Sequence, residues 1–392
     1  MIKKKIAVIH PLLRPGGGSE ARALWIAEAL KKEYKVSLIS MGKIDLDALN
    51  AYYGSDLKYD EIGIIEIPVP KLLRKKFDVL RYYRLSRYCR ENSDTFDLMI
   101  STYNVMDFGT GGIQFIADFS FDDDLRRECN PEPRRLSKYF YRGSFFRRSY
   151  IYLGKWLSGE SKKGWLKNIT IANSRWSAGV LRGKFGIDAK VVYPPVSDGF
   201  FDAKWEEKKK GFIAIGRLVP EKGFDKIIDI LNKVRKKGYD IHLHIIGIKS
   251  DVSYYKKLKK IVGEISDWCF LEGHIYGEEK KIVISGHKYG ISGRKNEPFG
   301  IAVAEMVKAG LIVWVPDGGG QVEIVNHDDL IYKTEEEAVA KIENVMKSAD
   351  KQKTLLRHLK KQAEKFSTTT FMSEIKNTVK EFFMGEKNNN IV

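Results

Sequence analysis

Apolar positions along the chain alternate between short continuous runs and runs with helical spacing. Residues 5–10 (KIAVIH) are almost continuously apolar, and a glycine-rich turn leads from them into residues 19–32 (SEARALWIAEALKK), where apolar positions recur every three or four residues. A buried strand and an amphipathic helix have these two patterns. The chain therefore begins with the strand, loop and helix of an α/β fold.

The same order of patterns returns in the second half of the chain. After the charge-dense stretch 197–211 (SDGFFDAKWEEKKKG), residues 211–238 again predict a strand, a loop and an amphipathic helix. Further strands are predicted at residues 36–42, 97–104, 241–247, 269–275 and 311–320. Two successive halves with βα alternation predict two Rossmann-like, doubly wound parallel-sheet domains that face a cleft.

We place the domain boundary near residue 200, with one domain at 1–200 and the other at 201–366. A length of 392 residues exceeds the usual size of a single core and favours two domains. The last segment, 367–386, has Ser and Thr at its start followed by helically spaced apolar residues, which predicts a final helix.

The composition, 43% hydrophobic and 30% charged, is that of a globular protein. No apolar run approaches the ~18 residues that a membrane-spanning helix needs, and the apolar part of the N-terminus is too short for a signal peptide. The cysteines are Cys89, Cys129 and Cys269, far apart, with neither a disulfide framework nor a metal-binding spacing. We therefore expect a cytoplasmic protein.

The net charge of +17 is concentrated in residues 134–184, which hold thirteen Lys and Arg, ten aromatic residues and a single acid, Glu160. Cations mixed with Trp, Tyr and Phe suit an anionic membrane surface, where rings lie at headgroup depth. They also suit single-stranded nucleic acid, where rings stack on bases. A solvated helical face over buried aromatic residues is the third interpretation, and the sequence leaves all three open.

The first candidate site is the glycine-rich loop 14–20 (RPGGGSE). Because glycine has no Cβ, the backbone at Gly17 and Gly18 could approach a bulky anion at a helix N-terminus. The spacing of the glycines matches neither the dinucleotide-binding nor the Walker pattern. A plain tight turn is the alternative.

The second candidate is the loop 216–223 (GRLVPEKG), which begins at Gly216 directly after a predicted strand. Arg217 and Lys222 offer a guanidinium and an ammonium that suit a diphosphate leaving group, whose negative charge grows as its bond to a sugar breaks. The alternative is a surface ion pair of these cations with Glu221.

The third candidate is the stretch 296–310 (NEPFGIAVAEMVKAG), in which Glu297 and Glu305 lie among apolar residues. Pro298 suits the first turn of a helix, so that Glu297 would lie just before the helix. Free N–H groups would come from its first residues, Phe299, Gly300 and Ile301. A capping acid plus an incidental buried Glu is the alternative, disfavoured because an unpaired buried carboxylate is costly.

These motifs resemble those of retaining GT-B glycosyltransferases over nearly the whole chain. The resemblance lies in GGGSE, NSRWSAGVLRGKFGIDAKVVYPPV, GRLVPEKG and EPFGIAVAEMVKAG, in the family's order. The E-x7-E and R-x4-K spacings together are specific. The resemblance implies an acceptor-side domain at 1–200, a nucleotide-sugar-binding domain at 201–366 and a last helix that crosses back to the first domain.

The resemblance also implies residue roles. Arg217 and Lys222 would bind the diphosphate, Glu297 the donor sugar and Glu305 the nucleotide ribose. Gly216, Phe299, Gly300 and Ile301 would complete the donor site, and Gly17 and Gly18 would line the cleft from the N-domain. No cofactor beyond the nucleotide-sugar donor and no metal ion is implied, and the leaving phosphate would accept the acceptor's proton.

Within this family the chain looks most like enzymes that mannosylate lipid-linked oligosaccharides. That likeness implies transfer of mannose from GDP-mannose to a glycan or polyprenyl-linked acceptor, with a UDP-sugar-dependent glucosyl- or N-acetylglucosaminyltransferase as the alternative. It also implies a peripheral enzyme on an anionic membrane surface, at its cytoplasmic face, and no nucleic-acid partner. A nucleic-acid-binding protein is the rival from another class, motivated by the charge of +17.

One departure concerns the position after a mid-N-domain strand, where many relatives have a histidine near the reacting sugar. This chain has Ala117 and Asp118 there. Asp118 is our candidate substitute, in polar contact with the donor or acceptor. Residues 122–124 formally contain D-x-D, the metal signature of the other main glycosyltransferase fold, and we interpret them as a solvated loop because that fold lacks a second α/β half.

Overall fold

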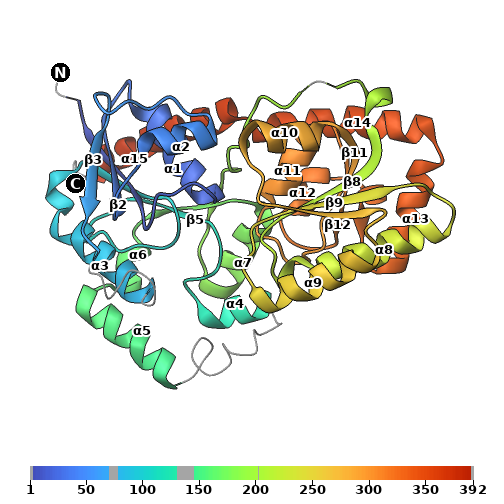
Figure 1. The fold of residues 1–392 in the computed structure, drawn as a ribbon. Coiled ribbons are helices and arrows are strands. Elements are labelled where there is room, and N and C mark those ends of the chain that lie inside the picture. Colours follow the sequence, from blue (N-terminus) through green and yellow to red (C-terminus); the bar gives the residue numbers. More distant parts are fainter. Residues whose placement is uncertain (1–2, 70–77, 130–144, 202, 390–392) are drawn as a thin grey trace. The chain divides into compact units, whose positions relative to one another are not determined.

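The computed structural model describes residues 3–69, 78–129, 145–201 and 203–389 (Figure 1). The chain divides into two compact units. The first comprises residues 1–195 together with 368–392, and the second comprises 196–367. Each unit is built on its own parallel sheet, which confirms the expected fold class of two Rossmann-like α/β domains.

The first unit has a seven-stranded sheet in the order β3-β2-β1-β4-β5-β6-β7, with all neighbours parallel. Its strands are β1 (Lys5–His10), β2 (Lys35–Met41), β3 (Gly63–Ile67), β4 (Leu98–Ser101), β5 (Ile113–Ile116), β6 (Ile169–Ala172) and β7 (Lys190–Val191). Its helices are α1 (Gly18–Leu30), α2 (Leu46–Tyr53), α3 (Asp78–Glu91), α4 (Asp123–Cys129), α5 (Phe145–Ser158), α6 (Lys162–Trp165), α7 (Arg175–Phe185) and α15 (Thr368–Asn389).

The second unit has a six-stranded parallel sheet in the order β10-β9-β8-β11-β12-β13. Its strands are β8 (Lys209–Ile215), β9 (His242–Ile246), β10 (Cys269–Gly273), β11 (His287–Ile291), β12 (Ile312–Pro316) and β13 (Ile331–Tyr332). Its helices are α8 (Phe224–Lys236), α9 (Val252–Glu264), α10 (Gly277–Ser285), α11 (Ile301–Lys308), α12 (Gln321–Val325), α13 (Glu335–Met346) and α14 (Ala349–Ala363).

In each sheet the strand order reverses once. The chain builds β1, β2 and β3 outward and then returns to place β4 on the other side of β1; β11 is likewise placed beside β8. At such a switch point the loops after the two central strands diverge and leave room for a ligand at the carboxyl ends of the strands. The loops after β8 and β11 therefore lie where a ligand site is expected.

The charge-dense stretch 197–211 follows the boundary between the two units. It contains a short 3-10 turn, Trp205–Glu207, and β8 begins within it at Lys209. Lys208 is buried, and its ammonium donates to the carbonyl of Ala309 at 2.7 Å, at the end of α11. A cation satisfies the carbonyl groups that a helix leaves unpaired at its C-terminus, so this lysine is part of the fold.

The last helix, α15, completes the core of the first unit. Phe371, Ile375 and Val379 are buried in one hydrophobic cluster with β1 and α1, for example with Ile6 and Leu24. Among the described residues, no helix is both long and apolar enough to cross a membrane.

Replacing Phe371 by alanine is expected to lower the free energy of unfolding by about 3–5 kcal/mol, because a fully buried ring is lost from a packed cluster. Urea denaturation followed by circular dichroism measures this. Met384, exposed on the same helix, provides the control, since Met384→Ala is expected to change little. Equal effects of the two substitutions would show that α15 does not complete the core.

Candidate active site

The loop after β8 is held in a tight backbone arrangement. Residues 220–222 form a 3-10 turn that Gly223 ends with a φ of +62°, a conformation that favours glycine. Gly293, in the loop after β11, approaches so closely that a Cβ there would lie 2.7 Å from the carbonyl oxygen of Lys222. The two switch-point loops are therefore in direct backbone contact, and side chains from both meet there.

Lys222 and Glu297 form an ion pair at this place, with Nζ and Oε2 2.5 Å apart. Arg294 Nη1 lies 3.3 Å from both oxygens of the same carboxylate. All three side chains are at most 18% exposed. Arg217 is more exposed, yet its charge also acts on both Lys222 and Glu297. The predicted residues Arg217, Lys222 and Glu297 are thus brought together from loops about 75 residues apart.

The electrostatics of the cluster keep Glu297 ionised. Burial by itself would raise the pKa of Glu297, but the charges of Arg294 and Lys222, the hydrogen bond from Lys222 and the charge of Arg217 lower it to about 2. Burial lowers the pKa of Lys222, opposed by Glu297. Three cations surround one carboxylate, so the cluster carries excess positive charge and suits a further anion.

The sequence did not indicate Arg294. It lies three residues before Glu297, inside the loop after β11, where the sequence gives no periodic pattern. The only sequence signal for Arg294 was its position near Glu297, and a cation close to a carboxylate in sequence is common on any protein surface.

Another glycine-rich stretch, residues 316–325 (PDGGGQVEIV), contacts the backbone of Glu297. Gly319 has a φ of +80°, and a Cβ there would lie 2.4 Å from the carbonyl oxygen of Glu297. The N–H of Gly320 donates to that carbonyl at 2.8 Å. Buried Gln321 accepts from Ser292 Oγ at 2.9 Å and donates to the Arg294 carbonyl. This stretch therefore fixes the loop that carries Arg294 and Glu297.

Helix α11 begins later than predicted. Pro298 lies before the helix, and the N-cap is Gly300 with a φ of +102°, a backbone conformation that favours glycine. Phe299 packs against Phe366 with ring centroids 5.5 Å apart. Gly300 and Ile301 are at the N-terminus of α11 as the prediction requires, whereas the ring of Phe299 belongs to the core of the unit.

Glu305, on α11, is paired with Lys280 of α10, whose ammonium lies 2.8 and 2.7 Å from the two carboxylate oxygens. Both side chains are about four-fifths buried. Glu305 is therefore not an unpaired carboxylate, and the alternative of an incidental buried Glu stays open. Its role as a ribose ligand stays a prediction, and Lys280 is a neighbour that the sequence analysis missed.

Gly216, the first residue of the loop after β8, lies beneath the side chain of Lys222. A Cβ at Gly216 would lie 3.2 Å from Cδ and Cε of that lysine, and a Cβ at Gly247 would collide with the carbonyl oxygen of Gly216. A side chain at either glycine would displace Lys222 or the loop. Without a side chain, Gly216 leaves room for the lysine, and its contact with the donor stays a prediction.

In the first unit, Gly17 is the N-cap of α1 and Gly18 is its first residue. The N–H groups of Gly16 and Gly17 both donate to the hydroxyl of Tyr53 at 3.0 Å. The carboxylate of Glu20 lies against Gly17, where a Cβ would be 2.2 Å from Oε2. Contact of an anion with Gly17 and Gly18 stays a prediction, and it requires Glu20 to move.

Asp118 follows β5 and belongs to a buried polar cluster at the carboxyl edge of the first sheet. It accepts from Asn104 Nδ2 at 3.2 Å and from the N–H of Ser120 at 2.9 Å. Burial lowers the pKa of Arg22 on α1, and the negative charges of Glu20 and Asp118 act in the opposite direction. Burial lowers the pKa of His10, at the end of β1, to about 3, so a neutral imidazole lies at the same edge. The sequence analysis missed His10 and Arg22.

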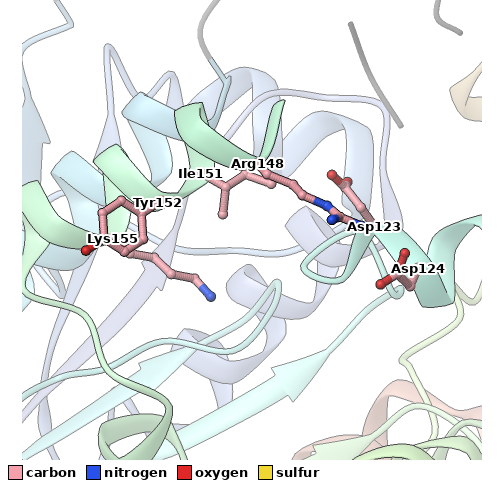
Figure 2. A pocket seen from close by; sticks show the side chains of 6 residues that line it. All are labelled: Asp123, Asp124, Arg148, Ile151, Tyr152 and Lys155. Carbon is pink, nitrogen blue, oxygen red and sulfur yellow. The ribbon is translucent and has the colours of Figure 1, made fainter. Parts of the chain in front are cut away.

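The acids at 122–124 are not a solvated loop. Asp122 caps the N-terminus of α4, accepting from the N–H groups of Asp124 and Leu125 at 3.0 and 2.8 Å. Figure 2 shows Asp123 and Asp124 facing Arg148 of α5 across a pocket. Its lining residues are Asp123, Asp124, Arg148, Ile151, Tyr152 and Lys155. The first D-x-D residue therefore serves as a helix cap.

Comparison with known proteins agrees with this architecture. The family model described as glycosyl transferases group 1 matches residues 197–366, nearly the whole second unit. Among solved structures, Anabaena HepE in complex with UDP-glucose is similar with a TM-score of 0.69 at 15% identity, covering 96% of this chain and 100% of that one. WaaG, a glycosyltransferase involved in lipopolysaccharide biosynthesis, is similar with a TM-score of 0.66 at 13% identity, covering 94% and 98%. The second unit thus matches the group 1 glycosyltransferases, and the whole chain has the GT-B fold of the solved glycosyltransferases.

Several curated relatives of this chain are named as mannosyltransferases. The human enzyme named GDP-Man:Man(3)GlcNAc(2)-PP-Dol alpha-1,2-mannosyltransferase is 23% identical over 439 residues, covering 96% of this chain and 87% of that enzyme. The Dictyostelium discoideum enzyme of the same name is 23% identical over 301 residues, covering 70% of this chain and 57% of that enzyme. The family model and these relatives support a glycosyltransferase as the class of this chain.

Glu297 makes a testable contribution to the pH dependence of stability. Its pKa in the folded glycosyltransferase is about 2 against an ordinary value of 4.5, so the unfolded chain binds the proton more readily. The stabilisation is fully present above about pH 4.5 and is lost as the pH falls toward 2. We expect the difference in unfolding free energy between wild type and Glu297→Gln to shrink by about 2 kcal/mol from pH 7 to pH 3.

Denaturant titrations at several pH values measure that difference. Glu206→Gln, at an exposed position, serves as the control and is expected to give no such trend. A constant difference for Glu297→Gln across the range would contradict the ionised cluster.

Proposed function

We propose that this glycosyltransferase transfers a hexose, with mannose from GDP-mannose as the first candidate, to a hydroxyl of a glycan or polyprenyl-linked acceptor with retention of configuration. The observation that carries the proposal is the cluster of Arg217, Lys222 and Arg294 around Glu297 at the switch point of the second sheet. Such a cluster suits the diphosphate of a nucleotide sugar. The choice of mannose rests on the curated relatives named as GDP-mannose-dependent enzymes.

In the proposed reaction the bond between the anomeric carbon and the diphosphate oxygen breaks while the acceptor oxygen bonds to the same face of that carbon. Arg217, Lys222 and Arg294 stabilise the negative charge that grows on the leaving diphosphate. A diphosphate oxygen takes the proton of the acceptor hydroxyl, so a separate general base is not needed. The three cations can balance the leaving charge, and we propose a metal-independent transfer on that ground.

Glu297 has two connected tasks in this proposal. It keeps Lys222 in place through the ion pair of 2.5 Å, and its ionised carboxylate offers acceptor oxygens to the hydroxyl groups of the donor sugar. Glu305 is proposed to accept from the ribose hydroxyls, with Lys280 holding its carboxylate. Gly17, Gly18 and Asp118 are proposed to contact the donor or acceptor from the first unit.

Lys222→Ala and Glu297→Ala are each expected to lower kcat by about 100- to 1,000-fold, because a preorganised charge at the leaving group is lost. The measurement is release of nucleoside diphosphate and formation of glycosylated acceptor. Lys236→Ala, an exposed lysine on α8, is the control and is expected to retain full activity. Full transfer rates in both site variants would refute the proposed mechanism.

A binding measurement tests the identity of the donor independently of the mechanism. A thermal-shift series with GDP-mannose, UDP-glucose and UDP-N-acetylglucosamine is expected to favour GDP-mannose. Stabilisation by a UDP-sugar alone would support the alternative UDP-dependent transferase, an alternative kept because HepE was solved with UDP-glucose.

The exposed face of α5 supports peripheral attachment to an anionic membrane, at its cytoplasmic face in this proposal. Tyr152 and Trp156 are 74% and 69% exposed, and they lie one turn apart. Leu153 and Leu157 beside them are also exposed, and Lys155 flanks the stripe. Rings and leucines can enter the headgroup region while the cation meets lipid phosphates. Trp165, in contrast, is buried. A solvated face over buried aromatic residues therefore describes the part of the basic segment around Trp165 but not the exposed rings of α5.

Co-sedimentation with vesicles tests this attachment. The wild type is expected to bind vesicles containing phosphatidylserine more strongly than vesicles of phosphatidylcholine, and Tyr152→Ser with Trp156→Ser is expected to lower binding about 10-fold or more. Tyr59→Ser is the control, because Tyr59 is similarly exposed but far from α5 in sequence. Binding that is equal for both lipids, or unchanged in the double variant, contradicts it. Residues 134–144 of the basic segment lie outside the described residues, and the absence of a nucleic-acid partner stays a prediction.

A further inference from the structure

Three of the chain's seven histidines meet in the second unit, at a place that the transfer reaction does not use. His242 and His244 lie two residues apart on β9 and therefore on one face of the sheet, and His287 is the first residue of β11. One ring nitrogen from each lies within 4.8 Å of the other two. Since His242 and His287 begin their strands, the cluster lies toward the amino ends, whereas Lys222 and Glu297 follow the carboxyl ends.

Two of these imidazoles are oriented by partners on their Nδ1 atoms. His287 Nδ1 lies 2.6 Å from the carbonyl oxygen of Val283, which can only accept, so Nδ1 carries the proton and the Nε2 lone pair is left for another partner. His244 Nδ1 lies 2.6 Å from Oε1 of Glu272. A carbonyl or carboxylate behind the imidazole is the usual support of a metal-binding histidine, because it fixes the tautomer and raises the basicity of the other nitrogen.

The distances between the rings fit a small cation. A tetrahedral zinc ion with Zn–N bonds of about 2.0–2.1 Å holds its ligand nitrogens roughly 3.3 Å apart. His242 Nε2 and His287 Nε2 are 3.1 Å apart, and the ring of His244 is 4.7 Å from that of His287 between centroids. Two ligand positions are thus nearly in place, and a nitrogen of His244 lies within 4.8 Å of both.

The backbone beneath the cluster leaves room for the rings. Gly211 on β8 lies under His242, and a Cβ there would be 2.2 Å from Nε2. The charges that face the rings are Lys209 and Arg235, which oppose a cation, and Asp240 and Glu272, which favour one.

We propose that His242, His244 and His287 bind a divalent transition-metal ion, zinc in the first place, with Glu272 supporting His244 from behind. Three imidazole nitrogens suit zinc and its neighbours and do not suit magnesium or calcium. The ion would join β9 to β11, the two strands on either side of β8. Its role is to stabilise the second unit, since it lies toward the opposite edge of the sheet from the proposed donor site. Without a metal, the same atoms form a hydrogen bond between His242 and His287.

Calorimetric titration of the tag-free, metal-stripped protein with zinc chloride tests the site. We expect one equivalent to bind, His244→Ala to weaken binding by about 100-fold or more, and Glu272→Gln to weaken it by about 10-fold. Cobalt(II) is expected to give the visible absorption of a tetrahedral site with nitrogen and oxygen ligands. His274→Ala, which removes an exposed histidine of the same unit, is the control and is expected to bind zinc as the wild type does.

Thermal unfolding provides the second readout. Zinc is expected to raise Tm for the wild type and the His274→Ala control but not for His244→Ala, because a ligand stabilises only the state that binds it. Glu272→Gln, at a partly exposed position, keeps the test decisive if His244→Ala fails to fold. Absence of stoichiometric zinc binding, or equal binding by wild type and both His244→Ala and Glu272→Gln, overturns the proposal.

Discussion

The carboxylate of Glu297, held ionised among Lys222, Arg294 and Arg217, is the interaction on which the second unit is arranged. A buried charge of this kind is stable only when its partners are fixed, and the surrounding backbone provides that. Gly293 brings the loop after β11 against Lys222, and Gly319 lets the next loop reach the backbone of Glu297. The excess positive charge that results is what suits the cluster to a nucleoside diphosphate.

The first unit also has a cluster of polar and charged side chains at the switch point of its sheet. Its switch-point edge holds a neutral His10, a buried Arg22 and Asp118 with its hydrogen-bonded neighbours. Such a polar edge is stable because the hydrophobic core behind it is closed by α15, whose Phe371 packs in one cluster with β1 and α1. The end of the chain therefore supports the unit from which the acceptor contacts are proposed to come.

The positively charged side chains of this protein have several different structural roles. Lys208 is buried to satisfy a helix end, Lys222 and Arg294 gather around a carboxylate, and Lys155 flanks an exposed aromatic stripe on α5. A net charge of +17 is thus the sum of different local requirements, and the proposed membrane attachment rests on the part of it that α5 carries.

The sequence by itself determined the α/β alternation and the two-sheet fold, and it indicated Arg217, Lys222 and Glu297 as candidate site residues. Hydrophobic periodicity and the position of a loop after a strand are local properties that the sequence shows directly. It did not determine the late start of α11, which a positive φ at Gly300 decides, or the cap formed by Asp122. Arg294, Lys280 and the three histidines became visible only when distant segments were packed together. An H-x-H on a strand places two rings on one face, but the third ring comes from a strand 43 residues further on, and only the tertiary structure decides that such side chains meet.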